Sequence, residues 1–236
     1  MRTLRYLGSF VIFMGYWGTR VLLGALFRVK QKSGGLYDQA ARGWARGMLK
    51  GTGIRVVLEG RERLDPAVPK VYIANHTSQV DIWAILAEFP GTLRFVYKKG
   101  MDWIPLMGMA MRAARHIPIR RQVKSAAFAA YDEAAQYIRE GMSAVVFAEG
   151  TRSRTGRLQA FKKGPFVLAI AAQAPVVPVL CLGTYELMPR GSWSPRPGVV
   201  RLLIGEAIPT AGMSYEDRAR LADATRAALL GLGARE

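Results

Sequence analysis

Short apolar runs rich in β-forming residues alternate with helical stretches from Gly53 to the end of the chain. Strands are predicted at 54–58, 71–74, 94–97, 117–120, 144–148, 176–182 and 199–204, and helices at 80–89, 124–139, 164–172 and 215–230. This alternation favours an α/β domain in which helices flank a mixed central β-sheet. With 236 residues, 50% of them hydrophobic, the chain is long enough for one domain with a full core.

The first fifty residues carry the features of a membrane-docking helical segment. Residues 1–5 are basic, and 6–27 are almost entirely apolar or aromatic apart from Arg20. The apolar run is long enough to span a bilayer, while Arg20 and the glycines at 15, 18 and 24 are equally compatible with a re-entrant hairpin. A secretory signal and a soluble core helix are further alternatives, although no small-residue cleavage site follows. We expect membrane-docking helices over 1–50 and an α/β domain over 51–236.

The charge of the chain restricts its partners. It carries 34 Lys+Arg against 17 Asp+Glu, a formal net charge of +17. Such a surface suits a polyanion: nucleic acid, an anionic membrane face or phosphorylated small molecules. Cys181 is the only cysteine, which excludes an intrachain disulfide and a cysteine-rich metal site. It lies in an apolar run and is predicted to be a buried small hydrophobe.

The stretch 70–83 places one of the two histidines where a predicted strand gives way to a helix. If the helix begins near Ser78, His76 lies on the preceding loop and can fold back to meet Asp81. A carboxylate that receives one ring N–H leaves the other ring nitrogen free to take a proton. Ser78 and Asp81 also form a capping-box pattern, in which Asp81 only satisfies backbone N–H groups and His76 is an ordinary turn residue. Both interpretations are open at this point.

A second polar turn follows the apolar run that ends at Ala148. Gly150 permits a tight backbone turn, Thr151 offers a hydroxyl, and Arg152 offers a planar fork that matches phosphate. Glu149 can orient the arginine or accept a hydroxyl. The alternative is a charged surface loop without a ligand.

Three pairs of cations stand where such a fold exposes them. They are Lys98 and Lys99, Arg120 and Arg121, and Lys162 and Lys163. The first two pairs end predicted strands, and the third opens a helix whose N-terminus can add its dipole to anion binding. The Met- and Trp-rich run 101–109 beside the first pair is either a soft apolar surface for an acyl chain or an ordinary core helix.

Four motifs in order over about 72–179 resemble the 1-acyl-glycerol-3-phosphate acyltransferases, a family within the wider glycerolipid acyltransferases. They are Asn75-His76-x4-Asp81, Ile117-Pro118-Ile119-Arg120-Arg121, Glu149-Gly150-Thr151-Arg152-Ser153 and Val176-Val177-Pro178-Val179. Each motif is short, but four in this order at sensible spacing are specific. The second motif departs from the family's pattern, since Arg115 stands where a glycine is usual and Arg120 where an acid is usual.

The resemblance implies a membrane-bound enzyme of phospholipid biosynthesis at the cytoplasmic face of the inner membrane. It would transfer a fatty acyl group from acyl-CoA or acyl carrier protein to lysophosphatidic acid, giving phosphatidic acid. We expect His76 to be the general base, oriented by Asp81. The expected phosphate-binding residues are Arg152, Arg121, Lys98, Glu149, Gly150 and Thr151, and the expected supporting residues are Asn75, Ser78, Lys99, Lys162 and Lys163. Because thiolate is a good leaving group, we expect no cofactor and no metal.

Three alternatives stay open. Ser78 could carry the acyl group as a nucleophile. The acceptor could be another lysolipid, such as a lyso-ornithine lipid or lysophosphatidylcholine. A protein of another class, a non-catalytic basic binder of membranes or nucleic acid, would account for the charge alone. The apolar first segment argues against nucleic acid as the partner.

Overall fold

A computed structural model describes residues 1–119 and 124–236, with the helix but not the side chains over 124–129. Within these residues a seven-stranded mixed sheet has the order β1-β7-β6-β2-β5-β3-β4, and only β6 and β7 pair antiparallel. The strands are β1 (Ile54–Glu59), β2 (Val71–Ala74), β3 (Leu93–Lys98), β4 (Ile117–Ile119), β5 (Ser143–Phe147), β6 (Val176–Leu182) and β7 (Gly198–Ile204). The predicted α/β class is confirmed, and each predicted strand is found, with Arg120 at the end of the predicted strand 117–120 lying outside the described residues.

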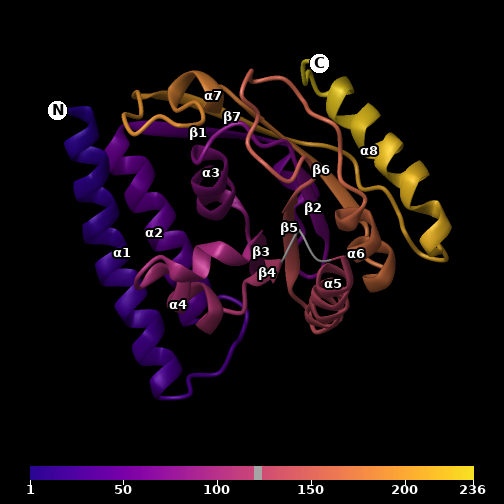
Figure 1. Cartoon of the computed structure of the whole chain (residues 1–236), viewed down its shortest axis with the longest axis horizontal. Helices are drawn as coiled ribbons and strands as arrows, with labels where there is room; N and C mark the ends of the chain where they lie inside the picture. The colour runs from indigo at the N-terminus through magenta and orange to yellow at the C-terminus, as the bar shows by residue number, and fades with distance from the viewer. Residues whose placement is uncertain (120–123) are drawn as a thin grey trace.

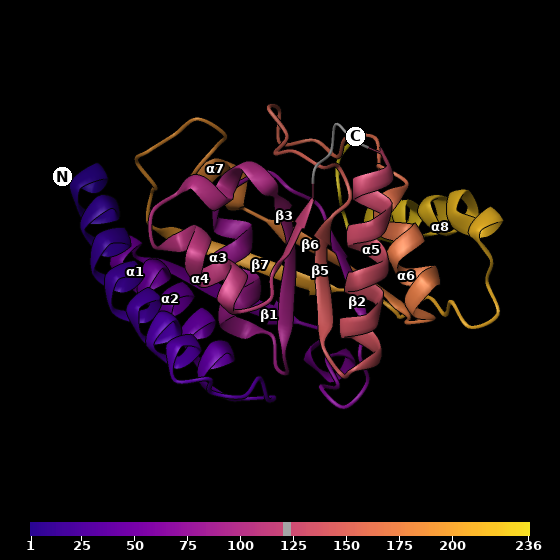
Figure 2. The same ribbon diagram turned by 60° about the horizontal axis from the view of Figure 1, so that its bottom comes forward.

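Helices flank the sheet on both sides (Figures 1 and 2). One group comprises α1 (Arg2–Leu26), α2 (Leu36–Thr52), α3 (Val80–Glu88) and α4 (Met107–Ala113), and the other α5 (Lys124–Arg139), α6 (Gly164–Ala172) and α8 (Arg218–Gly231). Short helical turns complete the chain: η1 (Arg61–Arg63), η2 (Lys99–Trp103), α7 (Thr184–Leu187) and η3 (Tyr215–Asp217). The predicted helix at 215–230 begins as η3, and Ser214 before it forms a reciprocal capping box with Asp217.

The central strand β2 is buried on both faces because side chains alternate along a strand. Val71 and Ile73 face the core under α5 and α6, whereas Tyr72 and Ala74 face the core under α2 and α3. Residues of α1 and α2, among them Tyr6, belong to this second core. The two helices before residue 50 therefore share a hydrophobic core with the α/β domain that follows them.

Glycines of α2 set the close packing of α1 on α2. Gly43, Gly47 and Gly51 follow one another at intervals of four residues, on one face of the helix. A side chain at Gly47 would overlap the ring of Phe13, and one at Gly51 would overlap Ser9. The two helices can approach closely only because these positions lack a Cβ.

α1 is continuous from Arg2 to Leu26, so of the alternatives that the sequence leaves open, the re-entrant hairpin at its glycines does not fit the structure. Gly18 and Gly24 serve packing instead, because Leu106 and Leu36 occupy the space that side chains would fill. Among the described helices, α1 is the one long and apolar enough, by length and composition, to cross a membrane.

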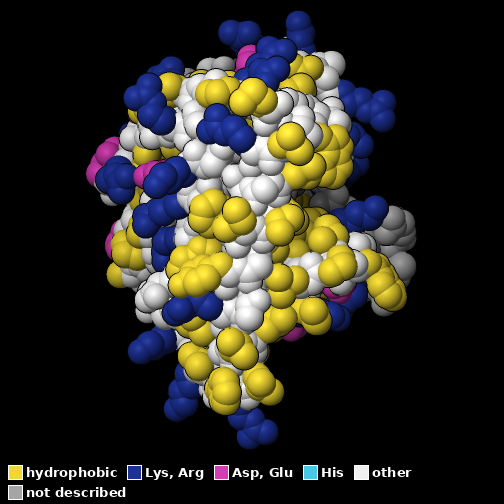
Figure 3. Space-filling model, turned by 90° about the vertical axis from the view of Figure 1, so that its left-hand side faces the viewer, with side chains coloured by type: hydrophobic (Ala, Val, Ile, Leu, Met, Phe, Trp, Pro, Cys, Tyr) yellow, Lys and Arg dark blue, Asp and Glu magenta, His cyan; other side chains and the backbone are white. Residues whose placement is uncertain are grey.

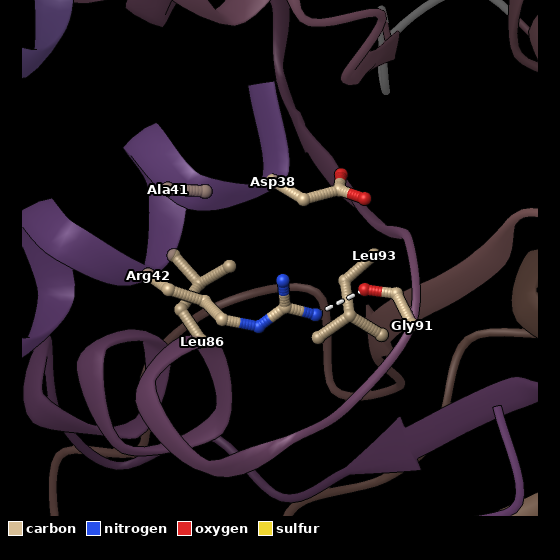
Figure 4. A pocket seen from close by; sticks show the side chains of 6 residues that line it. All are labelled: Asp38, Ala41, Arg42, Leu86, Gly91 and Leu93. Atoms are coloured by element: carbon tan, nitrogen blue, oxygen red, sulfur yellow. Dashed lines mark hydrogen bonds between the residues drawn. The ribbon is translucent and has the colours of Figure 1, made fainter. Parts of the chain in front are cut away.

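Buried polar contacts fasten α2 to the body of the domain. Arg94 of β3 donates to Asp38 at 2.9 Å, and both side chains are almost fully buried. Arg42 extends from α2 to the carbonyl oxygens of Gly91 and, at 3.2 Å, Phe89 (Figure 4). These carbonyls follow the last turn of α3, where a cation is favourable. The cavity lined by these side chains has a volume of about 10 Å³, which is too small for a substrate. The contacts between α2 and the rest of the domain are therefore structural.

The parallel order β2-β5-β3-β4 brings the carboxyl ends of four strands to one edge of the sheet. In sheets of this kind ligands bind outside that edge. The loops after β2 and β5 carry two of the polar motifs of the sequence, and β3 ends in Lys98. The candidate active site is at this edge.

Candidate active site

His76 and Asp81 are in contact at the carboxyl end of β2. The imidazole Nδ1 lies 2.8 Å from Oδ2 of Asp81, because the loop before α3 folds back over the first turn of that helix. Asp81 is fully buried, while 13% of the His76 side chain remains exposed. Within the described residues Nε2 of His76 has no hydrogen-bond partner. The ring therefore presents one free nitrogen to the surface.

The same oxygen of Asp81 also caps α3. Oδ2 accepts the backbone N–H groups of Thr77 at 2.8 Å and Ser78 at 2.9 Å. Asp81 thus does both: it caps the backbone N–H groups at the start of α3, and it contacts His76. Since Oδ2 acts as an acceptor in all three contacts, Nδ1 of His76 is a donor and Nε2 holds the lone pair. A carboxylate buried in this way stabilises a positive charge that develops on the imidazole.

Phe147 fixes the plane of the histidine ring. Its ring lies parallel to the imidazole, with centroids 3.8 Å apart and an interplanar angle of 12°. Phe147 ends β5, paired in register with Ala74 of β2, so the sheet itself sets the stack. A pair of this kind contributes about 0.5–1.5 kcal/mol. Nothing in the sequence singles out Phe147, which lies two residues before Glu149 and on the same strand face as Val145.

Glu149 supports the histidine loop rather than the arginines. It is 2% exposed, and its Oε1 accepts the backbone N–H of His76 at 2.7 Å. Its Oε2 accepts the backbone and side-chain N–H groups of Gln159, at 3.1 and 2.9 Å. Burial raises the pKa of Glu149, and these hydrogen bonds oppose that rise. The prediction that Glu149 orients the arginines of a phosphate site is corrected, because a buried carboxylate takes its donors from the surrounding loop.

The turn after Glu149 has the chemistry of an anion site. Gly150 has φ +74°, in the left-handed region that favours glycine. The N–H of Ser153 donates to the carbonyl of His76 at 2.7 Å and ties the turn to the histidine loop. Among the residues that the structure describes, the N–H groups of Thr151 and Arg152 and the Arg152 guanidinium have no hydrogen-bond partner. Two backbone donors and a cation thus remain for an anion.

Tyr6 places α1 near the turn that follows Glu149. Tyr6 is buried and packs on Trp83 of α3 and on Trp193, with ring centroids 5.9 and 6.4 Å apart. Burial raises the pKa of the Tyr6 hydroxyl, and the nearby charge of Arg152 opposes this rise. α1 therefore borders the candidate active site.

The cations at the end of β3 differ in their availability. Lys98 is exposed at the strand end and has no ion-pair partner within residues 1–119 and 124–236. Lys99 pairs with Asp102 at 2.7 Å and holds the η2 turn instead. Arg121, predicted to bind phosphate after the neighbouring strand β4, lies outside the described residues, as does Arg120.

Lys162 and Lys163 lie beyond the same edge of the sheet. Both are exposed, and the stem of Lys162 lies over Gly150, 3.4 Å from where a Cβ at that glycine would be. The carbonyl of Lys163 accepts the first N–H groups of α6. Lys162 is thus close to the turn after β5, and its supporting role stays a prediction.

Asn75 and Ser78 have structural partners. The Asn75 amide exchanges two hydrogen bonds with the backbone of Cys181, at 2.7 and 3.1 Å, and so continues the pairing of β2 with β6. Cys181 is buried, as predicted. The Ser78 hydroxyl donates to the Met188 carbonyl at 2.7 Å and accepts the N–H of Val80, with the residue fully buried. This geometry disfavours Ser78 as an acyl-carrying nucleophile.

The second histidine is not available as a base. Nδ1 of His116 accepts the N–H of Phe95 at 2.9 Å. Burial, with a smaller contribution from the charge of Arg94, lowers the pKa of His116 to about 3. His116 therefore stays neutral at physiological pH.

Comparisons with known proteins agree with this geometry. Residues 55–182 match the model of the acyltransferase family. A 1-acyl-sn-glycerol-3-phosphate acyltransferase of Chlamydomonas reinhardtii is 34% identical over 177 residues, which is 74% of this chain and 52% of that protein. The chloroplastic enzyme LPAT1 of Arabidopsis thaliana is 35% identical over 139 residues, 58% of this chain and 39% of that protein. The chain thus spans about half the length of these curated relatives or less.

A solved structure extends the similarity to the whole chain. The crystal structure of the 1-acyl-sn-glycerophosphate acyltransferase PlsC from Thermotoga maritima has a TM-score of 0.73 and 28% sequence identity, covering 100% of this chain and 99% of that one. The chain belongs to the acyltransferase family.

Proposed function

We propose that the chain transfers a fatty acyl group from acyl-CoA or acyl carrier protein to the sn-2 hydroxyl of 1-acyl-glycerol-3-phosphate, giving phosphatidic acid. The observation that carries this proposal is the contact of His76 with Asp81 beside a turn with free anion donors. The relatives are named as 1-acyl-sn-glycerol-3-phosphate acyltransferases, and the solved structure is that of a 1-acyl-sn-glycerophosphate acyltransferase, which supports the proposal.

The chemistry follows from the free nitrogen of His76. Nε2 takes the proton of the acceptor hydroxyl as that oxygen attacks the thioester carbonyl, while Asp81 stabilises the imidazolium that forms. The tetrahedral intermediate collapses with loss of the thiolate, which takes the proton back from the imidazolium. General-base catalysis of this kind contributes about 10²–10⁴-fold. Neither step requires a covalent acyl-enzyme or a bound cofactor.

The acceptor's phosphate would bind at the turn after β5. Arg152 offers its guanidinium, and the N–H groups of Thr151 and Arg152 add backbone donors. Lys98 and Lys162 add positive charge from the neighbouring loops. Because the Ser153 N–H ties this turn to the His76 carbonyl, the anion site and the base are held at a fixed separation, which supports catalysis by positioning.

The face formed by α1 would dock on an anionic membrane. Apolar side chains gather on this side of the molecule, with Lys and Arg around them (Figure 3). The large exposed apolar residues of this region are Leu4, Leu7, Val11, Ile12, Leu23, Leu26, Phe27, Trp103, Ile104 and Met109. Trp103 is 89% exposed, and indole rings favour the membrane interface. A cationic rim around an apolar face suits anionic headgroups on the cytoplasmic side of the inner membrane.

Acyl transfer by the purified protein tests the proposed reaction. A panel of lysolipid acceptors with acyl-CoA or acyl carrier protein as donor, read by product mass, should give phosphatidic acid, and His76→Ala should abolish turnover. His116→Asn, which retains an acceptor for the Phe95 N–H, is the matched control and should remain active. A product formed only from lyso-ornithine lipid or lysophosphatidylcholine would refute the choice of acceptor. Salt-sensitive retention on DNA without thiol release would favour the non-catalytic binder.

Vesicle binding tests the docking face. Binding to vesicles with anionic lipid should weaken with salt, and Val11→Glu should reduce it by about tenfold or more, because burying a charge in the bilayer costs a few kcal/mol. Val57→Glu, at an exposed position of β1, is the control. Equal binding of the two variants would refute this placement of the membrane.

A further inference from the structure

Gln159 is bonded on two sides within the loop that follows the anion-binding turn. Its backbone N–H and its side-chain amide both donate to Oε2 of Glu149, at 3.1 and 2.9 Å. The other oxygen of Glu149 accepts the N–H of His76 at 2.7 Å. A single buried carboxylate therefore connects Gln159 to the backbone of the proposed base.

An arginine of the last helix holds Gln159 from the opposite side. Arg226 of α8 donates from Nη1 to the carbonyl of Gln159 at 2.9 Å, and from Nη2 to Glu236 at 2.8 Å. Its guanidinium carbon lies 5.6 Å from the centroid of Phe161. α8 lies beyond residues 55–182, the part of the chain that matches the family model. The loop is thus clamped by a segment outside that region.

We propose that Gln159 is a positioning residue for His76: it acts through Glu149, and Arg226 holds it in place. The inference rests on the proposed function, in which His76 is the base. The donors of Gln159 keep the Glu149 carboxylate in its charged form and aim Oε1 at the N–H of His76. The loop that carries the imidazole then has one backbone position, in register with Asp81 and Phe147.

The proposal predicts the direction in which the pKa of Glu149 moves when the Gln159 amide is removed. The charged or titratable groups near this carboxyl are Asp81 on α3, His76 on its loop and Cys181 on β6, and Lys162 lies over the adjoining Gly150. Burial raises the pKa of Glu149, and its hydrogen bonds from His76 and Gln159 counteract this. Because the charged form is lost as pH falls through that pKa, removing the Gln159 amide must move the loss to higher pH.

Kinetics with a matched control give the first test. Gln159→Leu removes the side-chain amide and should lower kcat by roughly tenfold or more, the usual effect of losing a hydrogen bond to a charged group. The acid limb of the pH profile of kcat should move to higher pH by about one unit, while KM for the acceptor changes little. Gln136→Leu, on the exposed surface of α5, should leave all three quantities unchanged. Equal profiles for the two variants would overturn the proposal.

Backbone resonances give a second test that needs no activity. With ¹⁵N-histidine the described chain gives two labelled amides, and that of His76 touches Glu149 directly. The pH at which this amide responds should rise in Gln159→Leu relative to the wild type, and the response should disappear in Glu149→Gln. An unchanged midpoint would overturn the proposal. If the Leu variant does not fold, Gln159→Asn, whose amide is too short to reach Oε2, replaces it.

Arg226→Leu tests the clamp from α8. It should reproduce a weaker form of the Gln159→Leu phenotype, whereas Arg220→Leu, which breaks an exposed ion pair on the same helix, should not. If the wild-type protein shows no acyl transfer, but the midpoint of the His76 amide still rises in Gln159→Leu, the proposed function is refuted and the positioning contacts stand. Normal transfer with unshifted amides would refute the positioning role alone.

Discussion

Asp81 serves two purposes that different substitutions can separate. Its Oδ2 accepts hydrogen bonds from His76, Thr77 and Ser78, and the side chain is fully buried. Asp81→Asn keeps one oxygen at the position of Oδ2 and places its amide nitrogen at that of Oδ1, which has no partner within the described residues. Asp81→Ala removes the acceptor altogether. The first variant loses the charge, and the second loses the helix cap as well.

The magnitudes follow from these contacts. A hydrogen bond to a charged acceptor contributes about 1 kcal/mol more than a neutral one, so Asn should cost about 2 kcal/mol over the two backbone bonds. For a domain of this size that corresponds to roughly 4–8 °C in Tm. Ala leaves two buried N–H groups unpaired, at about 2 kcal/mol each, and should lower Tm by roughly 8–16 °C. Turnover should fall by about 10²-fold or more in both variants, because neither stabilises the imidazolium.

The assay pairs acyl transfer with thermal unfolding of the same samples. Ser78→Ala is the control, since it weakens the start of α3 and the bond to the Met188 carbonyl without changing the charge beside His76. It should lower Tm and leave turnover per folded molecule near normal. An Asn variant with kcat within about threefold of the wild type would show that Asp81 only caps the helix. Loss of turnover in Ser78→Ala at normal stability would instead favour the acyl-serine mechanism.

Three further predictions address substrate binding, packing and stability. Arg152→Ala should raise KM for lysophosphatidic acid by roughly 10- to 100-fold with a smaller change in kcat, whereas Arg154→Ala, at an exposed neighbour, should not; steady-state kinetics decide. Gly47→Ala should lower Tm because its methyl group meets Phe13, while Gly15→Ala, with open space around it, should be neutral or stabilising by about 0.5–1 kcal/mol. Asp38→Ala should cost about 3–5 kcal/mol because Arg94 is left buried without its carboxylate, and a denaturant titration that gives less than about 1 kcal/mol would contradict this.

The strands could be predicted because each is a short apolar run with turn residues on both sides. The shorter helices could not. α4 and α7 contain 7 and 4 residues, too few for a helical period to show. The sequence could not decide between a continuous helix and a hairpin over α1, because Gly18 receives Leu106 from a distant part of the chain. Nothing local in the sequence distinguishes a glycine that bends a helix from one that admits a neighbour.

The site divides in the same way. His76 and Asp81 are near in sequence, and their spacing allows a contact across the start of a helix that begins near Ser78. The partners of Glu149 depend on how three loops meet, so its inward orientation and its bond to Gln159 become visible only in three dimensions. Phe147 lies between these cases, since strand pairing sets its place beside β2.

The interlocking of Gly43, Gly47 and Gly51 with Trp17, Phe13 and Ser9 restricts how the protein can change over evolutionary time. A larger residue at one of these three glycine positions is tolerated only if a smaller residue replaces the opposing side chain in the same lineage. Such positions should therefore covary: a homologue with alanine at 51 is expected to have glycine at 9. This covariation should be detectable in an alignment of the family even where sequence identity over the first fifty residues is low.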